Sequence, residues 1–150
     1  MRHVRVPLIV VGSLFVAAQF VRFARTNPRV DGDFVAPVEV KNTLRRACYD
    51  CHSNETGWPW YSEVAPFSWL THREVSEGRR RLNFSEWAEY VSDPETAARK
   101  LEQISESLAH DDMPPWYYQL LHPGVRLTDA ERATLLRWVK QARADLPPPT

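Results

Sequence analysis

The sequence predicts an all-α fold. Apolar residues spaced three and four positions apart recur along the chain, and several of these stretches begin at residues typical of helix starts. No stretch shows the alternation of apolar and polar residues that is typical of a β-strand. The 150 residues include 12 Pro, 5 Gly and 6 Trp, which indicates short helices, rigid turns and a core rich in aromatic rings.

The length fits one compact domain with a short appendage. The 19 basic and 19 acidic residues give a formal net charge of zero, so the composition gives no reason to expect binding to nucleic acid. Both cysteines stand in one tetrapeptide, and no further cysteine is present to build a disulfide framework.

Residues 6–21 form an apolar run that follows two arginines. As a helix this run would rise about 24 Å, which is short of a hydrocarbon core of roughly 30 Å unless flanking residues extend it. We expect residues 1–22 to form an N-terminal transmembrane helix that anchors the protein. A cleaved signal peptide is the alternative, because the small residues Ala17 and Ala18 come after an apolar stretch of suitable length within the run, and both interpretations imply export.

Residues 23–36 lack periodicity and contain Asn-Pro and Asp-Gly turn signals, so we expect a linker. The domain itself is expected over residues 37–146, followed by a Pro-rich tail at 147–150. Its first helix should begin at Pro37, which suits a first helical turn. One face of that helix carries Val40, Leu44 and Ala47.

A second helix is expected from Pro66 to about Arg81, after an irregular loop with Gly and Pro as breakers. Its apolar face consists of Phe67, Leu70, Val75 and Gly78. Asn83 and Glu86 then resemble a capping box for a short helix that carries Trp87.

Two longer helices complete the domain. Ser92 with Glu95 begins the first of them, and Thr128 with Glu131 forms a capping box for the last. The first has one buried stripe of Ala97, Leu101, Ile104 and Leu108. The last buries Leu135, Trp138, Val139 and Ala142.

The chemistry is concentrated in Cys48-Tyr49-Asp50-Cys51-His52, a Cys-x-x-Cys-His motif. Two thiols at this spacing, at the end of a helix, can each form a thioether with one vinyl group of the same porphyrin. The imidazole that follows then lies beneath the iron. The motif therefore predicts one covalent haem c, attached through Cys48 and Cys51, with His52 as the fifth ligand. Haem of this kind is installed outside the cytoplasm, which agrees with an export segment.

Two other uses of the cysteines remain open. A redox dithiol of the thioredoxin kind should follow a strand of a βαβ unit, and no strand is predicted. A zinc site would need two more ligands from scattered histidines.

Met113 is the leading candidate for the sixth iron ligand, because it is the only methionine besides Met1 and the two prolines after it hold the backbone extended. Its alternative role is filling the core. His110 and His122 are rival ligands, whereas His72 lies to the side of its helix's apolar face.

Aromatic residues crowd both proposed ligands and are expected to wall the haem from water, although ordinary core packing would equally explain each ring. The expected haem-contacting rings are Trp58, Trp60, Tyr61, Trp69 and Trp116. Arg79, Arg80 and Arg81 would either pair with haem propionates or a redox partner, or form a solvated helix face.

These motifs together resemble the haem-binding domain family of bacterial exported proteins, which is itself similar to class I cytochromes c. The resemblance spans most of residues 40–140. It rests on the segments Cys48–Asn54, Trp58–Ser62, Ala65–Trp69, Gly78–Trp87, Met113–Pro115 and His122–Pro123.

The resemblance implies a cytochrome c-like helical domain around one covalent haem, in which the helix before Cys48 crosses the last helix near Leu135 and Trp138. It implies a location at the bacterial inner membrane, with the haem domain on the periplasmic side. The function expected is single-electron transfer to an unidentified redox partner protein, with His52 and Met113 as axial ligands.

The alternative function is a haem-based sensor or small-ligand binder with an exchangeable sixth position, and a periplasmic thiol protein is a third. No enzymatic activity is expected, because the single Cys-x-x-Cys-His offers no second haem to relay electrons in a peroxidase.

Overall fold

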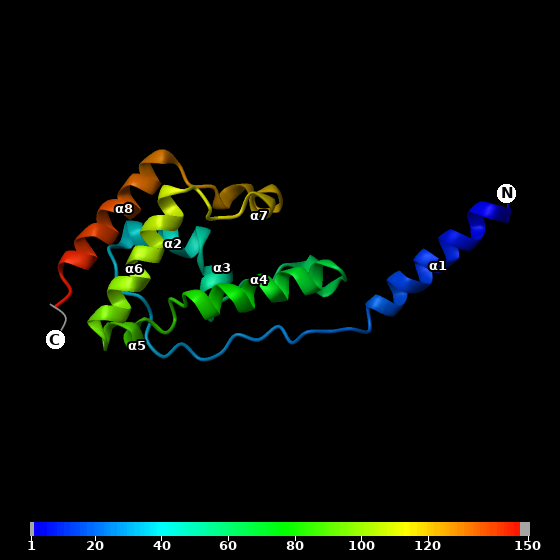
Figure 1. The fold of residues 1–150 in the computed structure, drawn as a ribbon, viewed down its shortest axis with the longest axis horizontal. Coiled ribbons are helices and arrows are strands. Elements are labelled where there is room, and N and C mark those ends of the chain that lie inside the picture. The colour runs from blue at the N-terminus through cyan, green and yellow to red at the C-terminus, as the bar shows by residue number, and fades with distance from the viewer. Residues whose placement is uncertain (1, 148–150) are drawn as a thin grey trace.

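The computed structural model describes residues 2–147, and every regular element within that range is a helix, so the predicted all-α class is confirmed (Figure 1). The elements in chain order are α1 (Arg2–Ala18), α2 (Val38–Ala47), α3 (Tyr49–His52), the 3-10 helix η1 (Trp60–Glu63), α4 (Phe67–Arg81), α5 (Trp87–Val91), α6 (Pro94–Ala109), α7 (Trp116–Leu121), the 3-10 helix η2 (Pro123–Val125) and α8 (Asp129–Ala144).

The core forms where α8 packs against α6 and α2 (Figure 1). The apolar stripe predicted for α6 is entirely buried: Ala97, Leu101, Ile104 and Leu108. Leu44 of α2 and Leu135 and Val139 of α8 belong to the same core, while Trp138 and Ala142 pack at its margin. Burial of each large aliphatic side chain contributes about 1.5–3 kcal/mol, so this crossing is the main source of stability.

The starts of the helices agree only in part with the sequence signals. The Thr128–Glu131 capping box of α8 is present, with both reciprocal hydrogen bonds. The start predicted for α6 was one residue early, because Asp93, rather than Ser92, caps the helix by accepting from the amides of Glu95 and Thr96.

The capping box predicted from Asn83 and Glu86 was wrong. The Asn83 side-chain amide donates to the Glu86 carboxylate at 2.8 Å, and its carbonyl accepts from the Ser85 amide at 3.1 Å. Both groups therefore stabilise the loop before α5, and α5 has no side-chain cap.

The apolar face predicted for α4 is buried only at its C-terminal half. Val75 and Gly78 are buried, but Phe67 and Leu70 are about half exposed. The reason is the position of α4, whose N-terminal half extends beyond the α2–α6–α8 core toward α1 (Figure 1).

Residues 19–36, which contain the predicted linker, run along α4 and into the core; we call them the strap (Figure 1). Phe34 is fully buried, and its ring packs edge-on against Trp87 at 4.5 Å and Trp138 at 4.8 Å between centroids. Upstream, the amides of Asp31 and Gly32 both donate to the Ser85 carbonyl at 3.2 Å. The strap is thus in contact with the domain over much of its length.

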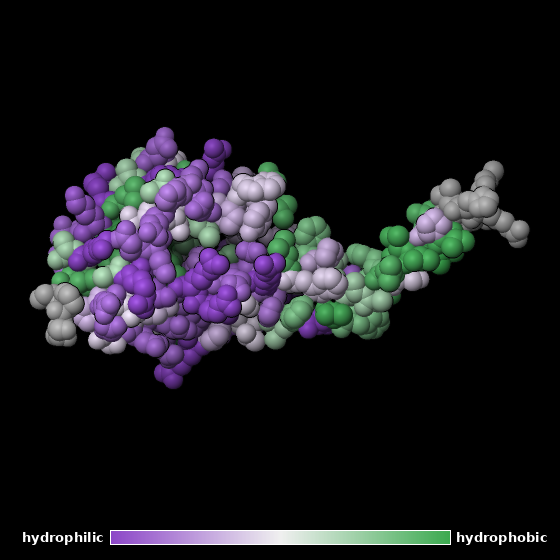
Figure 2. All heavy atoms as spheres, viewed as in Figure 1, coloured by the Kyte–Doolittle hydropathy of each residue, from purple (hydrophilic) through white to green (hydrophobic). Residues whose placement is uncertain are grey.

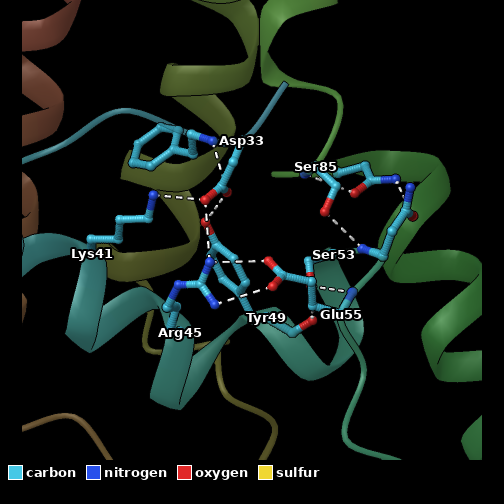
Figure 3. Close-up of polar contacts among 10 residues, drawn as sticks. Asp33, Lys41, Arg45, Tyr49, Ser53, Glu55 and Ser85 are labelled. Carbon is cyan, nitrogen blue, oxygen red and sulfur yellow. Dashed lines mark hydrogen bonds and ion pairs between the residues drawn. The ribbon is translucent and has the colours of Figure 1, made fainter. Parts of the chain in front are cut away.

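A polar cluster fixes the end of the strap to α2 and α3 (Figure 3). The Asp33 carboxylate accepts from the Tyr49 hydroxyl at 2.8 Å and pairs with Lys41 at 2.6 Å and Arg45 at 3.2 Å. Arg45 also pairs with Glu55, so the cluster connects the strap to the residues on both sides of the Cys-x-x-Cys-His motif.

Helix α1 projects away from the domain, and its apolar side chains are more than half exposed (Figures 1 and 2). Within residues 2–147 no helix is long and apolar enough to cross a membrane, so the predicted N-terminal transmembrane helix is not supported. The helix ends at Ala18, before the last apolar residues of the run, Phe20 and Val21. Residues 148–150 of the predicted Pro-rich tail lie outside the described residues.

Candidate functional site

The Cys-x-x-Cys-His motif occupies the corner between α2 and α3. Cys48 ends α2 and precedes α3, and its carbonyl accepts from the amides of Cys51 at 3.2 Å and His52 at 2.9 Å. This single helical turn keeps both thiols and the imidazole on the wall of one cavity. Helix α4 crosses directly behind it, where only a glycine fits: a Cβ on Gly78 would lie 2.3 Å from the Cys51 carbonyl oxygen.

The His52 imidazole is oriented for coordination through one defined nitrogen. Its Nδ1 lies 3.0 Å from the Leu82 carbonyl oxygen, which can only accept, so Nδ1 carries the proton and Nε2 keeps its lone pair. Burial lowers the pKa of His52, which favours the neutral form that binds metals. The Phe84 amide donates to the His52 carbonyl at 2.8 Å and fixes the backbone as well.

Burial keeps the two thiols in their protonated form. Burial raises the pKa of Cys48 to about 12, helped by the neighbouring Cys51, and burial with the charge of Asp50 raises the pKa of Cys51 to about 12. Redox-active dithiols instead require a lowered thiol pKa. The absence of a strand from residues 2–147 also disfavours a thioredoxin-like dithiol.

A zinc site is not supported either. The part of the chain that the structure describes has no group of at least three His, Cys, Asp or Glu side chains that could hold a metal ion.

His52 and Met113 border the same space. Two neighbouring cavities, of about 310 and 270 Å³, are both lined by Cys48, His52, Arg81 and Met113. A third cavity of about 140 Å³ continues past Cys51 between α4 and α7. Together they reach the range of about 300–1,000 Å³ that is typical of cofactor sites. The residues present therefore fit a haem held by the motif on one side and reached by Met113.

The loop that carries Met113 is held between α6 and α8. The Asp112 amide donates to the Ser107 carbonyl at 3.1 Å, and Arg132 of α8 donates to the Leu108 carbonyl at 2.6 Å. Beyond the methionine, the Gln119 side chain donates to the Pro114 carbonyl at 2.6 Å. These bonds fix both ends of the segment, and they are contacts that sequence reasoning missed.

The rival histidines lie elsewhere. His110 is exposed at the end of α6, where its ring is hydrogen-bonded to the Glu106 carbonyl. His122 stacks on Tyr118 at 4.1 Å between centroids, and His72 stacks on Phe23 of the strap at 4.6 Å. Among the described residues that line the three cavities there is no histidine besides His52.

Of the predicted haem-contacting rings, Tyr61 lines a cavity, but the four tryptophans lie away from all three. Trp58 and Trp69 donate their indole N–H groups to the strap, at Asn27 and the Val21 carbonyl. Trp60 and Trp116 are 79% and 72% exposed. None of the four tryptophans therefore lines these cavities: Trp58, in the loop before η1, and Trp69 of α4 contact the strap, and Trp60 and Trp116 face solvent.

Other aromatic residues line the cavities instead: Phe67, Phe84, Tyr117 and Tyr118. The Tyr118 hydroxyl donates to the Asp50 carboxylate at 2.7 Å, and burial together with this bond raises the pKa of Tyr118, so the hydroxyl stays protonated. The run Trp116-Tyr117-Tyr118 indicates that aromatic rings lie near the site. Which of these rings faces the cavity depends on the position of each residue on the helix.

The three consecutive arginines of α4 have different surroundings. Arg79 donates to the Ser53 carbonyl at 2.7 Å and the Thr26 carbonyl at 2.9 Å, so it connects the residue after His52 to the strap. Arg80 is exposed and pairs with Glu77. Of the three, only Arg81 lines the two cavities beside His52, and Arg73 lines the 310 Å³ cavity as well.

Comparisons with known proteins place the chain in a family. The chain is similar to cytochrome c peroxidase of Escherichia coli (strain K12), with 26% identity over 101 residues, which cover 67% of this chain and 22% of that protein. The chain thus spans about a fifth of the relative's length. No solved structure matches. A family model described as a haem-binding domain matches residues 13–141, which include the whole site. The chain therefore belongs to the haem-binding domain family.

Proposed function

We propose that the domain carries one haem c and transfers single electrons, with His52 and Met113 as axial iron ligands. The observation that carries this proposal is that His52 and Met113 line the same two cavities together with Cys48. When bound, the haem supplies an iron that gains or loses one electron at a time.

The chain's own residues would have distinct tasks. The thiols of Cys48 and Cys51 would each hold the haem by adding across one vinyl group, with sulfur on one vinyl carbon and the thiol hydrogen on the other. The Leu82 carbonyl holds the His52 ring with Nε2 available. A Met113 thioether raises the reduction potential relative to a second histidine. Arg73 and Arg81 line the largest of the three cavities and are suitably charged to pair with propionates.

Covalent attachment is tested on the protein produced in cells that mature cytochromes c. We expect the mass of the denatured polypeptide to include one haem, and Cys48→Ala with Cys51→Ala to abolish this increment. A polypeptide mass without haem in the unsubstituted protein would contradict the proposal.

The sixth ligand is tested by Met113→Ala, with His110→Ala as the matched control. We expect Met113→Ala to lose the charge-transfer band of a ferric iron–sulfur bond and to bind carbon monoxide rapidly in the ferrous state, whereas His110→Ala keeps the spectrum. If His110→Ala or His122→Ala changed the spectrum and Met113→Ala did not, Met113 would not be the ligand. Rapid carbon monoxide binding by the unsubstituted protein would favour the sensor alternative.

We propose further that this chain is not itself a peroxidase, although a relative is a cytochrome c peroxidase. The support is the single Cys-x-x-Cys-His motif in the sequence. Steady-state consumption of hydrogen peroxide with a reduced cytochrome as electron donor tests this point, and turnover above that of free haem would refute it.

We also propose a location on the periplasmic side of the bacterial inner membrane, with α1 associating with the bilayer. The support is the apolar surface of α1 together with a haem type that is installed outside the cytoplasm. Membrane fractionation before and after a high-salt wash, with the redox spectrum followed in each fraction, tests the association independently of the haem.

A further inference from the structure

One end of the haem domain exposes large apolar side chains. We call this surface, contributed by η1, the N-terminal half of α4 and α7, the apolar end. Its exposed members are Trp60, Phe67, Trp69, Leu70, Trp116, Leu120 and Leu121. Figure 2 shows hydrophobic atoms at the end of the domain that faces α1, and a mostly hydrophilic surface over the rest of the domain in this view.

The members on η1 and α4 form one group with Leu121 of α7, whereas Trp116 and Leu120 line a separate cavity with Asp112 and Arg126. The Tyr61 ring lies 6.0 Å from the Trp60 ring and 6.3 Å from the Phe67 ring, measured between centroids. Leu70 of α4 and Leu121 of α7 line the same small cavity as Phe67 and Tyr61. Single exposed apolar residues are ordinary on a protein surface, but a contiguous group of this size marks an interaction site.

The N-terminal helix is attached to the apolar end with almost no intervening chain. Immediately after α1, the Gln19 side chain accepts from the Ala65 amide at 3.0 Å. Two residues later, the Val21 carbonyl accepts from the Trp69 indole at 3.1 Å. Any surface that receives the apolar side chains of α1 is therefore brought next to Trp69 and its neighbours.

We propose that the apolar end docks on the lipid bilayer, beside α1. The proposal rests on the membrane association of α1 proposed above. Tryptophan is suited to this position, because its ring is apolar and its N–H group still finds a polar partner at the headgroup level. Removing Trp60, Phe67 and Leu121 from water supplies the driving force, since each of these side chains is at least half exposed.

Docking also determines which side a redox partner can approach. The small cavity beside Cys51, bounded by Phe67 and Leu121, lies at the apolar end and would be covered by lipid. The 270 Å³ cavity on the other side of His52 is bounded by α6 residues such as Ile104 and Ser107, and it would remain accessible to a soluble protein.

The experiment uses the full haem-loaded chain with phosphatidylcholine–phosphatidylglycerol vesicles that contain a lipid with a photoactivatable acyl chain. Labelled peptides are identified by mass spectrometry. We expect label on peptides from η1, α4 and α7 as well as on α1. The triple variant W60S/F67S/L121S should lower labelling of the domain peptides about tenfold while labelling of α1 persists.

A matched triple variant, V35S/V38S/V91S, removes exposed apolar residues from the strap, α2 and α5, and should leave the labelling unchanged. Label confined to α1, or equal domain labelling in both triple variants, would overturn docking of the apolar end. Absence of label from α1 would overturn the membrane association as well, whereas the haem spectrum tests electron transfer separately. Cross-links between two copies through Trp60 or Trp116 without vesicles would assign this surface to a dimer and also overturn the proposal.

Discussion

Gly78 is the residue at which the space behind the haem motif is most restricted. An added Cβ would lie 2.3 Å from the Cys51 carbonyl oxygen and 3.1 Å from the Cys51 Cβ, so Gly78→Ala must separate α4 from α3. We expect a loss of about 1–3 kcal/mol of unfolding free energy, typical of overpacking. Chemical denaturation measures this loss, and the yield of covalent haem should fall with it.

Gly124→Ala is the control for that change, because nothing lies within 4 Å of the corresponding Cβ. It should alter the unfolding free energy by no more than about 0.5 kcal/mol. Equal effects of the two substitutions would show that the contact between Gly78 and Cys51 does not limit the packing of α4.

Asp33 gives the domain a defined sensitivity to acid. Burial raises the pKa of Asp33, but its hydrogen bonds with Lys41, Tyr49 and the Phe34 amide outweigh burial, and the pKa lies below the ordinary 3.8. The stability from this lowered pKa is complete above the ordinary value and is lost as the pH falls through the native-state value.

Asp33→Asn tests this dependence. The difference in unfolding free energy between the natural chain and the variant should be constant above about pH 5 and should shrink below about pH 4. The exposed Asp31→Asn serves as the control. A difference that did not change with pH would contradict the role assigned to the Asp33 carboxylate.

The identity of a residue predicts its chemistry better than it predicts whether its side chain points toward the cavity. Cys48, His52 and Met113 could be selected as candidates because their side chains are rare and their chemistry is specific, and all three line the same two cavities. Trp60 and Trp116 could not be assigned in the same way, since a ring next to a ligand in sequence points toward the cavity or away from it according to its position on η1 or α7. The structure exposes both rings.

At the level of elements, the capping box of α8 shows how much a residue at a helix start contributes to the unfolding free energy. Thr128 accepts from the Glu131 amide at 3.2 Å, and the Glu131 carboxylate accepts from the Thr128 amide at 2.9 Å. Thr128→Ala should lower the unfolding free energy by about 1 kcal/mol, whereas Thr128→Ser keeps the hydroxyl and should cost much less. Thermal or urea unfolding distinguishes them, and equal losses in both variants would mean that the hydroxyl cap is not what stabilises α8.

The elements that were predicted well are those whose signals are local. The buried stripe of α6 and the cap of α8 depend on residues three or four apart, which the sequence displays directly. The buried half of α4 and the real contacts of Asn83 depend on which distant segment packs there. Gly78 packs against the Cys51 backbone, and the Asn83 side chain donates a hydrogen bond to the Asn54 side chain at 2.9 Å. Neither partner can be found from local periodicity.

For the whole molecule, the strap is the part that sequence patterns describe least well. Its turn signals predict a linker, but Phe34 is fully buried between helices and the backbone of Arg29 accepts from the Asn54 side chain at 2.7 Å. An isolated aromatic residue in an aperiodic segment was the only local sign of this. The partners that bind the strap lie on α2, α3, α4, α5 and α8 and in the loops between them, and most of them are far from the strap in sequence.

Arg79 should control whether the strap stays bound. Its guanidinium donates to the Thr26 carbonyl at 2.9 Å, the Asn27 side chain at 3.0 Å and the Thr56 hydroxyl at 2.8 Å. Hydrogen bonds of a charged donor contribute about 1.5–3 kcal/mol each, so Arg79→Gln should raise the open fraction of the strap at least about tenfold.

Tryptic cleavage after Arg29 measures that opening, because the rate follows the open population when reclosing is fast. Arg80→Gln is the matched control, since it removes a neighbouring arginine of α4 that points to solvent and pairs with Glu77. Faster cleavage in Arg79→Gln alone would show that one side chain holds the strap against the residues that follow His52.

Because Arg79 also donates to the Ser53 carbonyl, the same variant should loosen the haem motif, and its covalent haem yield should fall in parallel with the protection of Arg29. Rapid cleavage of the unsubstituted protein would instead mean that the strap is a linker after all.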